Sequence, residues 1–353
     1  MKLELIDRVK PGEILGKSIL AFDGKILLNQ GTILNSSYMN RIKEMGVYYI
    51  YVNDGELEDV EVNDNFLVDL KRSAMNSISN IMKNTLLIKD RKEGIEVIKT
   101  LEELIQYIAE NADINKSLND IQTHNNQRYV HCVEVCVMSI FLGKTMKLKR
   151  EQLKELGLAA ILHDVGMAKI SPKILEKNGG YSPEELLVLR EHPHKGYEIL
   201  KQNTGISETV LKSVLQHHER IDGKGYPNGL LGHQIHKYAK IIAVCDMYDL
   251  VTNNDNYKKS FKPHDAYELI IGGSSYIFDE EVVFSFRKTF SVYPLGSCVM
   301  LSNGIEGYVV KQNKNFPDRP VLRVTYDKDI GENIEPYEID LVEDINVVIK
   351  CIV

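Results

Sequence analysis

The chain has 353 residues, 43% of them hydrophobic and 26% charged, which predicts a folded protein with one main domain and smaller modules beside it. Its 43 basic and 50 acidic side chains leave a formal charge of -7, which argues against binding to long nucleic acid. The sequence has no uninterrupted apolar stretch of about 18 residues and no apolar core of a secretion signal. We therefore expect a cytoplasmic protein without membrane insertion.

Residues 1–63 are predicted to form a small α+β module. Short apolar runs separated by turn residues indicate strands near 14–20, 25–29 and 48–52. Apolar residues three apart predict a helix over residues 36–45, with Ser36 or Ser37 as its N-cap. Catalytic clusters are not evident in this module.

Residues 64–112 are predicted to form a helical connector, because their Ile, Leu and Met residues recur at helical spacing. Two helices fit this length. The apolar stripe indicates a packing surface, and the alternative is the face of a homodimer.

Residues 113–291 keep the helical period and are predicted to form the main domain. One helix should begin after Ser182, because the sequence Ser-Pro-Glu-Glu places an N-cap serine, a proline at the first position and a glutamate at the third. After Pro294 the period changes to two, which predicts strands near 298–301, 307–311, 320–326 and 337–342. Residues 292–353 should then form a small β-barrel, and the expected fold class is mainly α.

The His and Asp residues of the main domain are concentrated in five short pieces. A lone His on a helix is usually structural, so any single piece is weak evidence. His163 and Asp164, however, end an apolar run, where a charged pair is costly unless a partner such as a metal ion satisfies it. Imidazoles and carboxylates without nearby thiolates suit Fe, Mn, Ni or Zn rather than a structural zinc site. The candidate metal ligands are His131, His163, Asp164, His192, His217, His218 and Asp246.

Seven ligands exceed the needs of one tetrahedral ion. We therefore expect two ions about 3.5–4 Å apart, with a carboxylate bridging them and a shared hydroxide placed for in-line attack on phosphorus.

A resemblance to a known family becomes specific after His217. Residues 217–227 read His-His-Glu-Arg-Ile-Asp-Gly-Lys-Gly-Tyr-Pro. The segment from Asp222 onward, taken alone, is a glycine-rich turn. Together with the preceding His pair, the segment resembles the HD-GYP family within the HD superfamily of metal-dependent phosphohydrolases, and the resemblance covers about residues 114–290.

The resemblance implies an all-helical HD-type catalytic domain that hydrolyses cyclic dinucleotides, above all cyclic di-GMP, to the linear form pGpG. Further cleavage to GMP is left open. It also implies two divalent ions, with iron expected first, and Asp164 as their bridge. The other six candidate ligands would then bind one ion each.

The implied substrate shell includes the loop formed by Gly225, Tyr226 and Pro227, which should lie near the nucleotide. Tyr257 and Lys258 also match positions of the family pattern and are predicted substrate contacts.

Three positions depart from the family pattern. Met167 stands where the family has a phosphate-binding lysine, so Lys169, two residues on, joins Asp164 as a predicted catalytic residue. Asp255 replaces an arginine of the substrate shell, and Gln127 replaces a glutamate that binds a third metal in some members. We therefore expect two metals and an altered substrate shell.

Two other functions are compatible with parts of this pattern. Met167 and Asp255 favour a catalytically weak module that binds a cyclic dinucleotide or another protein, such as a diguanylate cyclase. An HD-superfamily hydrolase of nucleoside phosphates would explain the His-Asp pair but would leave residues 217–218 and 225–227 without a role.

Overall fold

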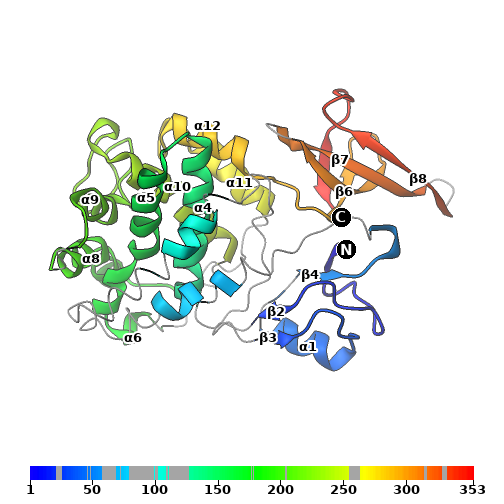
Figure 1. Ribbon diagram of the computed structural model, residues 1–353, viewed down its shortest axis with the longest axis horizontal. Helices are drawn as coiled ribbons and strands as arrows, with labels where there is room; N and C mark the ends of the chain where they lie inside the picture. Colours follow the sequence, from blue (N-terminus) through cyan, green and yellow to red (C-terminus); the bar gives the residue numbers. More distant parts are fainter. Residues whose placement is uncertain are drawn as a thin grey trace. The chain divides into compact units, whose positions relative to one another are not determined.

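A computed structural model describes residues 1–20, 26–45, 47, 49–57, 69–71, 73–78, 99, 102–108, 110, 127–175, 177, 179–202, 205–253, 263–313, 316–327 and 332–353. The chain divides into two compact units (Figure 1). One unit contains residues 1–64 together with 287–353, and the other contains residues 65–112 and 127–286. The finer division into four parts at residues 63, 112 and 291 stays a prediction.

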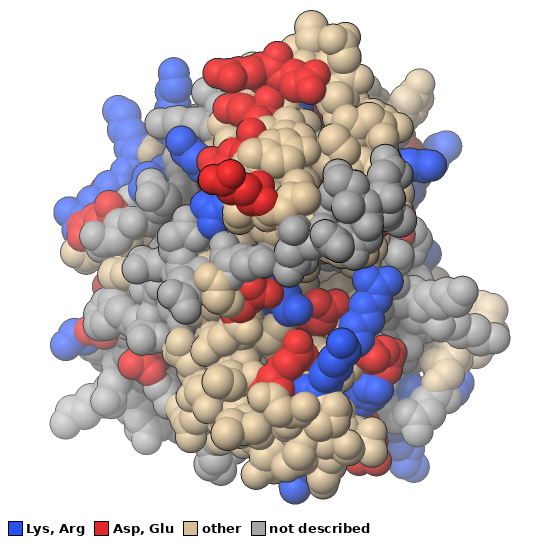
Figure 2. Space-filling model, turned by 90° about the vertical axis from the view of Figure 1, so that its right-hand side faces the viewer, with Lys and Arg blue, Asp and Glu red and all other residues tan. Residues whose placement is uncertain are grey.

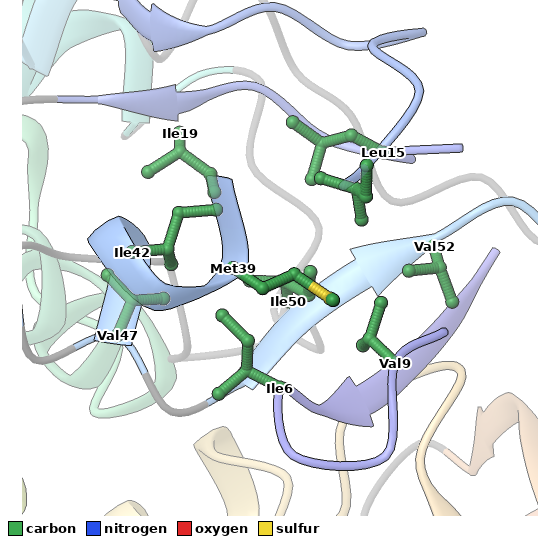
Figure 3. Close-up of a cluster of buried hydrophobic side chains, with 10 residues drawn as sticks. Ile6, Val9, Leu15, Ile19, Met39, Ile42, Val47, Ile50 and Val52 are labelled. Carbon is green, nitrogen blue, oxygen red and sulfur yellow. The ribbon is translucent and has the colours of Figure 1, made fainter. Parts of the chain in front are cut away.

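The N-terminal module pairs its first strand with its last. Strand β1 (Lys2–Leu5) lies antiparallel to β4 (Tyr49–Val52), and β2 (Ile19–Leu20) pairs with β3 (Ile26–Leu28). Helix α1 (Ser36–Glu44) and a short turn of 3-10 helix, η1 (Gly55–Leu57), complete it. Side chains from α1, β4 and the connecting segments form a buried cluster that includes Ile6, Met39, Ile42 and Ile50 (Figure 3).

Two details of this module differ from expectation. The N-cap of α1 is Asn35, whose side-chain oxygen accepts a hydrogen bond from the Tyr38 N–H at 2.8 Å, so the prediction of Ser36 or Ser37 is wrong by one or two positions. Strand β1 was not predicted. Its sequence, Lys-Leu-Glu-Leu, alternates polar and apolar residues, a signal for a strand that the prediction did not use.

The C-terminal segment forms one antiparallel sheet in the order β8-β7-β6-β5-β9. Its strands are β5 (Cys298–Leu301), β6 (Glu306–Asn313), β7 (Phe316–Asp327), β8 (Glu332–Asp340) and β9 (Ile349–Ile352). The predicted barrel is wrong, because β8 and β9 lie at opposite edges and do not pair with each other. Strand β8 carries Pro336, which has no N–H to donate, and exposed charged side chains, both features of an edge strand.

The exposed edge strand and the turn after it are acidic. Glu335, Glu338 and Glu343 are all exposed, and Figure 2 shows Asp and Glu side chains gathered at the top of this face. The expected absence of binding to long nucleic acid stays a prediction.

The described residues of the connector are helical at 69–71, 73–78 and 102–108, as predicted. Ile78, Leu104 and Ile108 are buried, and Ile105 packs directly against Gly157 of the main domain. These described residues of the apolar stripe therefore pack within the chain. The homodimer face stays a prediction.

The regular elements described in the main domain are helices, joined by turns and loops. Its elements are α4 (Gln127–Thr145), α5 (Arg150–Leu162), η3 (Val165–Lys169), α6 (Pro172–Leu175), α7 (Pro183–Leu189), α8 (His192–Lys201), α9 (Glu208–Gln216), η4 (Gly232–Gln234), α10 (Lys237–Asn253), α11 (Pro263–Gly272) and α12 (Glu280–Thr289). Helices α4, α5 and α10 pack side by side (Figure 1), and α8 packs against η3 and α9.

Helix α7 begins as predicted. The Ser182 side chain accepts a hydrogen bond from the Glu185 N–H at 3.3 Å, and the Glu185 carboxylate accepts one from the Ser182 N–H at 2.7 Å. None of the described helices combines the length and the apolar character needed to cross a membrane.

Candidate metal centre

The seven predicted ligands come from five elements and meet in the helical domain. His131 projects from α4, and His163 and Asp164 follow the last residue of α5. The remaining ligands are His192 at the start of α8, His217 and His218 just after α9, and Asp246 on α10. Because α5 and α9 both end at this point, the partial negative charge of their C-termini favours a cation there.

The ligands form two groups that share Asp164. Each residue offers one potential ligand atom, an imidazole nitrogen or a carboxylate oxygen. These atoms lie within 4.8 Å of one another in His131, His163 and Asp164. The same holds for the second group, which consists of Asp164, His192, His217 and His218. One oxygen of Asp164 lies 3.1 Å from His192 Nε2, 3.8 Å from His163 Nε2 and 4.0 Å from His217 Nε2. A single carboxylate therefore faces imidazoles of both groups.

Asp246 also faces both groups. Its Oδ1 lies 3.1 Å from His131 Nε2 and 3.8 Å from His163 Nε2, while its Oδ2 lies 3.6 Å from His218 Nδ1. Its side chain is only 5% exposed, whereas that of His218 is 20% exposed. The centre is therefore buried, and His218 marks the side on which solvent reaches it.

Backbone carbonyl groups orient three of the imidazoles. The Nδ1 atoms of His163, His192 and His217 lie 2.6, 2.8 and 2.6 Å from carbonyl oxygens three residues earlier in the chain. A carbonyl oxygen only accepts, so each Nδ1 carries a hydrogen and each neutral imidazole presents a bare Nε2 to the centre. This is the tautomer that a metal ion requires of a ligand bound through Nε2.

The contacts between the imidazoles fit a bound cation. His192 Nε2 lies 3.1 Å from His217 Nε2, and two bare nitrogens at this distance repel each other unless a cation lies close to both. Burial lowers the pKa of His163, and lowers that of His217 and His218 well below the ordinary value. These imidazoles are therefore neutral, the form that binds metal.

His131 has a different environment because carboxylates flank both of its nitrogens. Its Nδ1 lies 2.7 Å from Asp249 Oδ2, and its Nε2 lies 3.1 Å from Asp246 Oδ1. Burial lowers the pKa of His131, but the hydrogen bonds and charges of the two carboxylates outweigh burial and raise it well above its ordinary value. The surroundings of His131 thus stabilise positive charge, whether a proton or a metal ion supplies it.

Asp249 is a site residue that our sequence analysis missed. It lies on α10, three residues after Asp246, so both carboxylates occur on one face of the helix. Its side chain is only 6% exposed, and no motif in the sequence links it to His131, which lies 118 residues earlier. The spacing of two acidic residues in the largely apolar middle of the helix was the available signal.

The Gly-Tyr-Pro loop lies against His218, and its predicted contact with a nucleotide stays a prediction. The Tyr226 N–H donates to the His218 carbonyl oxygen at 3.2 Å, and the Tyr226 ring stacks on the His218 ring with centroids 4.7 Å apart. A side chain at Gly225 would collide with the backbone of Glu219 and Arg220, which explains the glycine.

The buried Glu219 carboxylate stabilises the backbone segment that follows this loop. It accepts hydrogen bonds from the backbone N–H groups of Asn228 at 2.7 Å and Leu230 at 2.9 Å. Glu219 is 4% exposed, so the carboxylate is removed from water and its two hydrogen bonds are charge-assisted. Sequence analysis recorded this glutamate as part of the motif and assigned it no role.

Gly166 allows the His-Asp turn to approach α8 closely. A Cβ atom at this position would collide with the His192 carbonyl oxygen and the Gly196 nitrogen. The contact places Asp164, two residues earlier, beside His192. The glycine after the His-Asp pair is therefore required by backbone packing.

The other residues singled out in the sequence have no described contact with the centre. Lys169 ends η3 and is exposed, Met167 is half-buried, and His194 is exposed. Tyr257, Lys258, Asp255 and His124 lie outside the described residues, as does the side chain of Gln127. The roles of these residues, and the absence of a third metal, stay predictions.

Comparison with known protein families agrees with this geometry. Residues 113–282 match the HD domain family, and residues 298–353 match a KOW domain associated with HD domains. These matches confirm the HD-GYP resemblance seen in the sequence.

The chain is similar to named phosphodiesterases over part of its length. It is 35% identical over 210 residues to a cyclic di-GMP phosphodiesterase of Pseudomonas aeruginosa, covering 60% of this chain and 50% of that protein. It is 28% identical over 197 residues to the cyclic di-GMP phosphodiesterase PdeB of Borreliella burgdorferi, covering 56% and 52%. The chain thus spans about half the length of these relatives.

Two further comparisons concern substrate and fold. A 3'3'-cGAMP-specific phosphodiesterase of Vibrio cholerae is 29% identical over 152 residues, covering 43% of this chain and 35% of that protein. A solved structure of an HDG"Y"P protein from Bdellovibrio bacteriovorus has a TM-score of 0.50 at 17% identity, covering 80% of this chain and 97% of that one. At this identity the likeness describes the fold alone.

Proposed function

We propose that this chain is a metal-dependent phosphodiesterase that hydrolyses cyclic di-GMP to linear pGpG. The observation that carries the proposal is Asp164, a buried carboxylate shared by two groups of imidazoles. The activities named for the P. aeruginosa and B. burgdorferi relatives support the choice of substrate. Cleavage of pGpG to GMP is a second step that the same assay would detect.

Two divalent transition-metal ions would be held by the seven predicted ligands, with Asp164 as the bridging carboxylate and iron as the first candidate. When bound, such ions supply Lewis acidity toward a phosphate oxygen and lower the pKa of water. The other six ligands would bind one ion each. Asp246 faces imidazoles of both groups, so it is suited to bind on the open side near His218.

The surrounding residues would keep these ligands in place. The carbonyl oxygens near His163, His192 and His217 set their tautomers, and Asp249 fixes the orientation of His131. Glu219 holds the loop that places Tyr226 beside His218, where a substrate would enter. Lys169 is a candidate phosphate contact at the end of η3.

Product analysis tests this function. The full chain would be purified anaerobically, loaded with Fe(II) or Mn(II), and incubated separately with cyclic di-GMP and 3'3'-cGAMP, with products separated by chromatography. We expect pGpG from cyclic di-GMP and about two ions per chain by elemental analysis. Metal-loaded protein that yields no linear product would refute the activity, and faster cleavage of 3'3'-cGAMP would reassign the substrate.

The wider setting of the activity stays a prediction. A homodimer through the connector helices, a diguanylate cyclase-type partner and a cytoplasmic location were expected from the sequence. Sedimentation of the full chain would test the first of these.

A further inference from the structure

Arg190 lies next to the metal centre, although no motif marks it. It is the C-cap of α7, two residues before His192. Its guanidinium carbon lies over the Tyr226 ring at 5.4 Å from the centroid, and the same ring stacks on His218. One aromatic ring therefore separates a permanent positive charge from a predicted metal ligand.

Two other cations of this region are already paired with carboxylates. Arg220 donates two hydrogen bonds to Asp222, at 2.6 and 3.1 Å, and Lys195 lies 2.7 Å from Glu191. Arg190 is exposed, and with the residues that the structure describes it forms neither an ion pair nor a side-chain hydrogen bond. Its charge has no partner among them.

The ring contact suits this arginine to bind an anion. A guanidinium that lies over an aromatic face keeps its in-plane N–H groups available, and these match two oxygens of a phosphate. The contact with Tyr226 also restricts the side chain, so less conformational entropy is lost when an anion binds. Met167, in the turn after Asp164, offers no charge for this purpose.

We propose that Arg190 is a substrate-binding residue that holds a phosphate of the cyclic dinucleotide beside His218. This inference rests on the proposed function, because it assumes a phosphodiester at the metal centre. It assigns the Gly-Tyr-Pro loop a second role, which is to position Arg190 through the Tyr226 ring. The phosphate that Arg190 contacts would approach from the exposed side of the centre.

The test compares Arg190→Ala and Arg190→Lys with wild type and with Lys201→Ala. Lys201 is a matched control, because its Nζ lies 5.3 Å from the Tyr197 ring centroid at the other end of α8. Steady-state kinetics with cyclic di-GMP would give KM and kcat. Calorimetric titration with a hydrolysis-resistant phosphorothioate analogue of cyclic di-GMP would give Kd.

We expect Arg190→Ala to raise both KM and Kd about tenfold, as for the loss of one charge-assisted contact, with little change in kcat. Arg190→Lys should recover part of the loss, since it keeps the charge and loses the planar fork. The difference from wild type should shrink as salt concentration rises. Lys201→Ala should match wild type.

Unchanged KM and Kd in Arg190→Ala would overturn the inference while leaving the proposed function intact. A fall in kcat alone would also overturn it, because this would indicate a structural role through Tyr226. If wild type binds the analogue without cleaving cyclic di-GMP, the proposed function fails and the calorimetric comparison decides the inference. If wild type does not bind the analogue, both fail.

Discussion

Asp249 offers the sharpest test of how the protein prepares the metal centre. Its carboxylate accepts a hydrogen bond of 2.7 Å from His131 Nδ1, and its side chain is 6% exposed. Partners of this kind orient the imidazole and raise its basicity, and their removal typically lowers metal affinity about 10- to 100-fold. That range corresponds to about 1.4–2.8 kcal/mol of binding free energy.

We expect Asp249→Ala to lie at the upper end of this range, because it leaves the buried Nδ1–H group without an acceptor. Asp249→Asn should lie at the lower end, since its carbonyl oxygen can still accept the hydrogen bond without the negative charge. Loss of the acceptor should also destabilise the metal-free protein by about 1–3 kcal/mol in Asp249→Ala. Asp265→Asn, an exposed position in the first turn of α11, is the control.

Metal affinity would be measured by competition with a chelator of known affinity, with bound metal determined by elemental analysis. Thermal unfolding of each metal-free variant would separate an effect on folding from an effect on the centre. An affinity of Asp249→Ala within about twofold of wild type, well below the expected loss, would refute the idea that Asp249 tunes His131.

Three further changes test other parts of the centre. Glu219→Gln should destabilise the closed Gly-Tyr-Pro loop by about 1–3 kcal/mol, because the NH2 group of the new amide must face one of two backbone N–H donors. Limited proteolysis of the loop should then be faster, and an unchanged rate would contradict this. Gly166→Ala should destabilise the fold by about 1–3 kcal/mol or more, because the added carbon collides with backbone of α8; a melting temperature equal to that of wild type would argue against this packing. Asp164→Ala should abolish turnover and reduce occupancy of both metals, whereas His194→Ala, at an exposed position, should be mild; equal damage from both would mean that the ligand assignment is wrong.

The sequence by itself determined the kind of site. His163 and Asp164 end an apolar run, where they are costly to bury without a partner, so the pattern alone indicates a cation site, and the structure brings all seven ligands together. Local rules also sufficed at Ser182, where the capping hydrogen bonds involve residues three positions apart. Interactions within one turn of helix depend little on the rest of the fold.

Tertiary structure decided whatever depends on residues far apart in the chain. The carboxylate that orients His131 is 118 residues away, and Arg190 reaches Tyr226 only because α7 ends beside the loop. Strands β1 and β9 were missed, and closure of the sheet was wrongly expected, because the partners with which a strand pairs lie far from it in the chain. A sequence pattern specifies which groups need a partner, and only packing specifies which partner they meet.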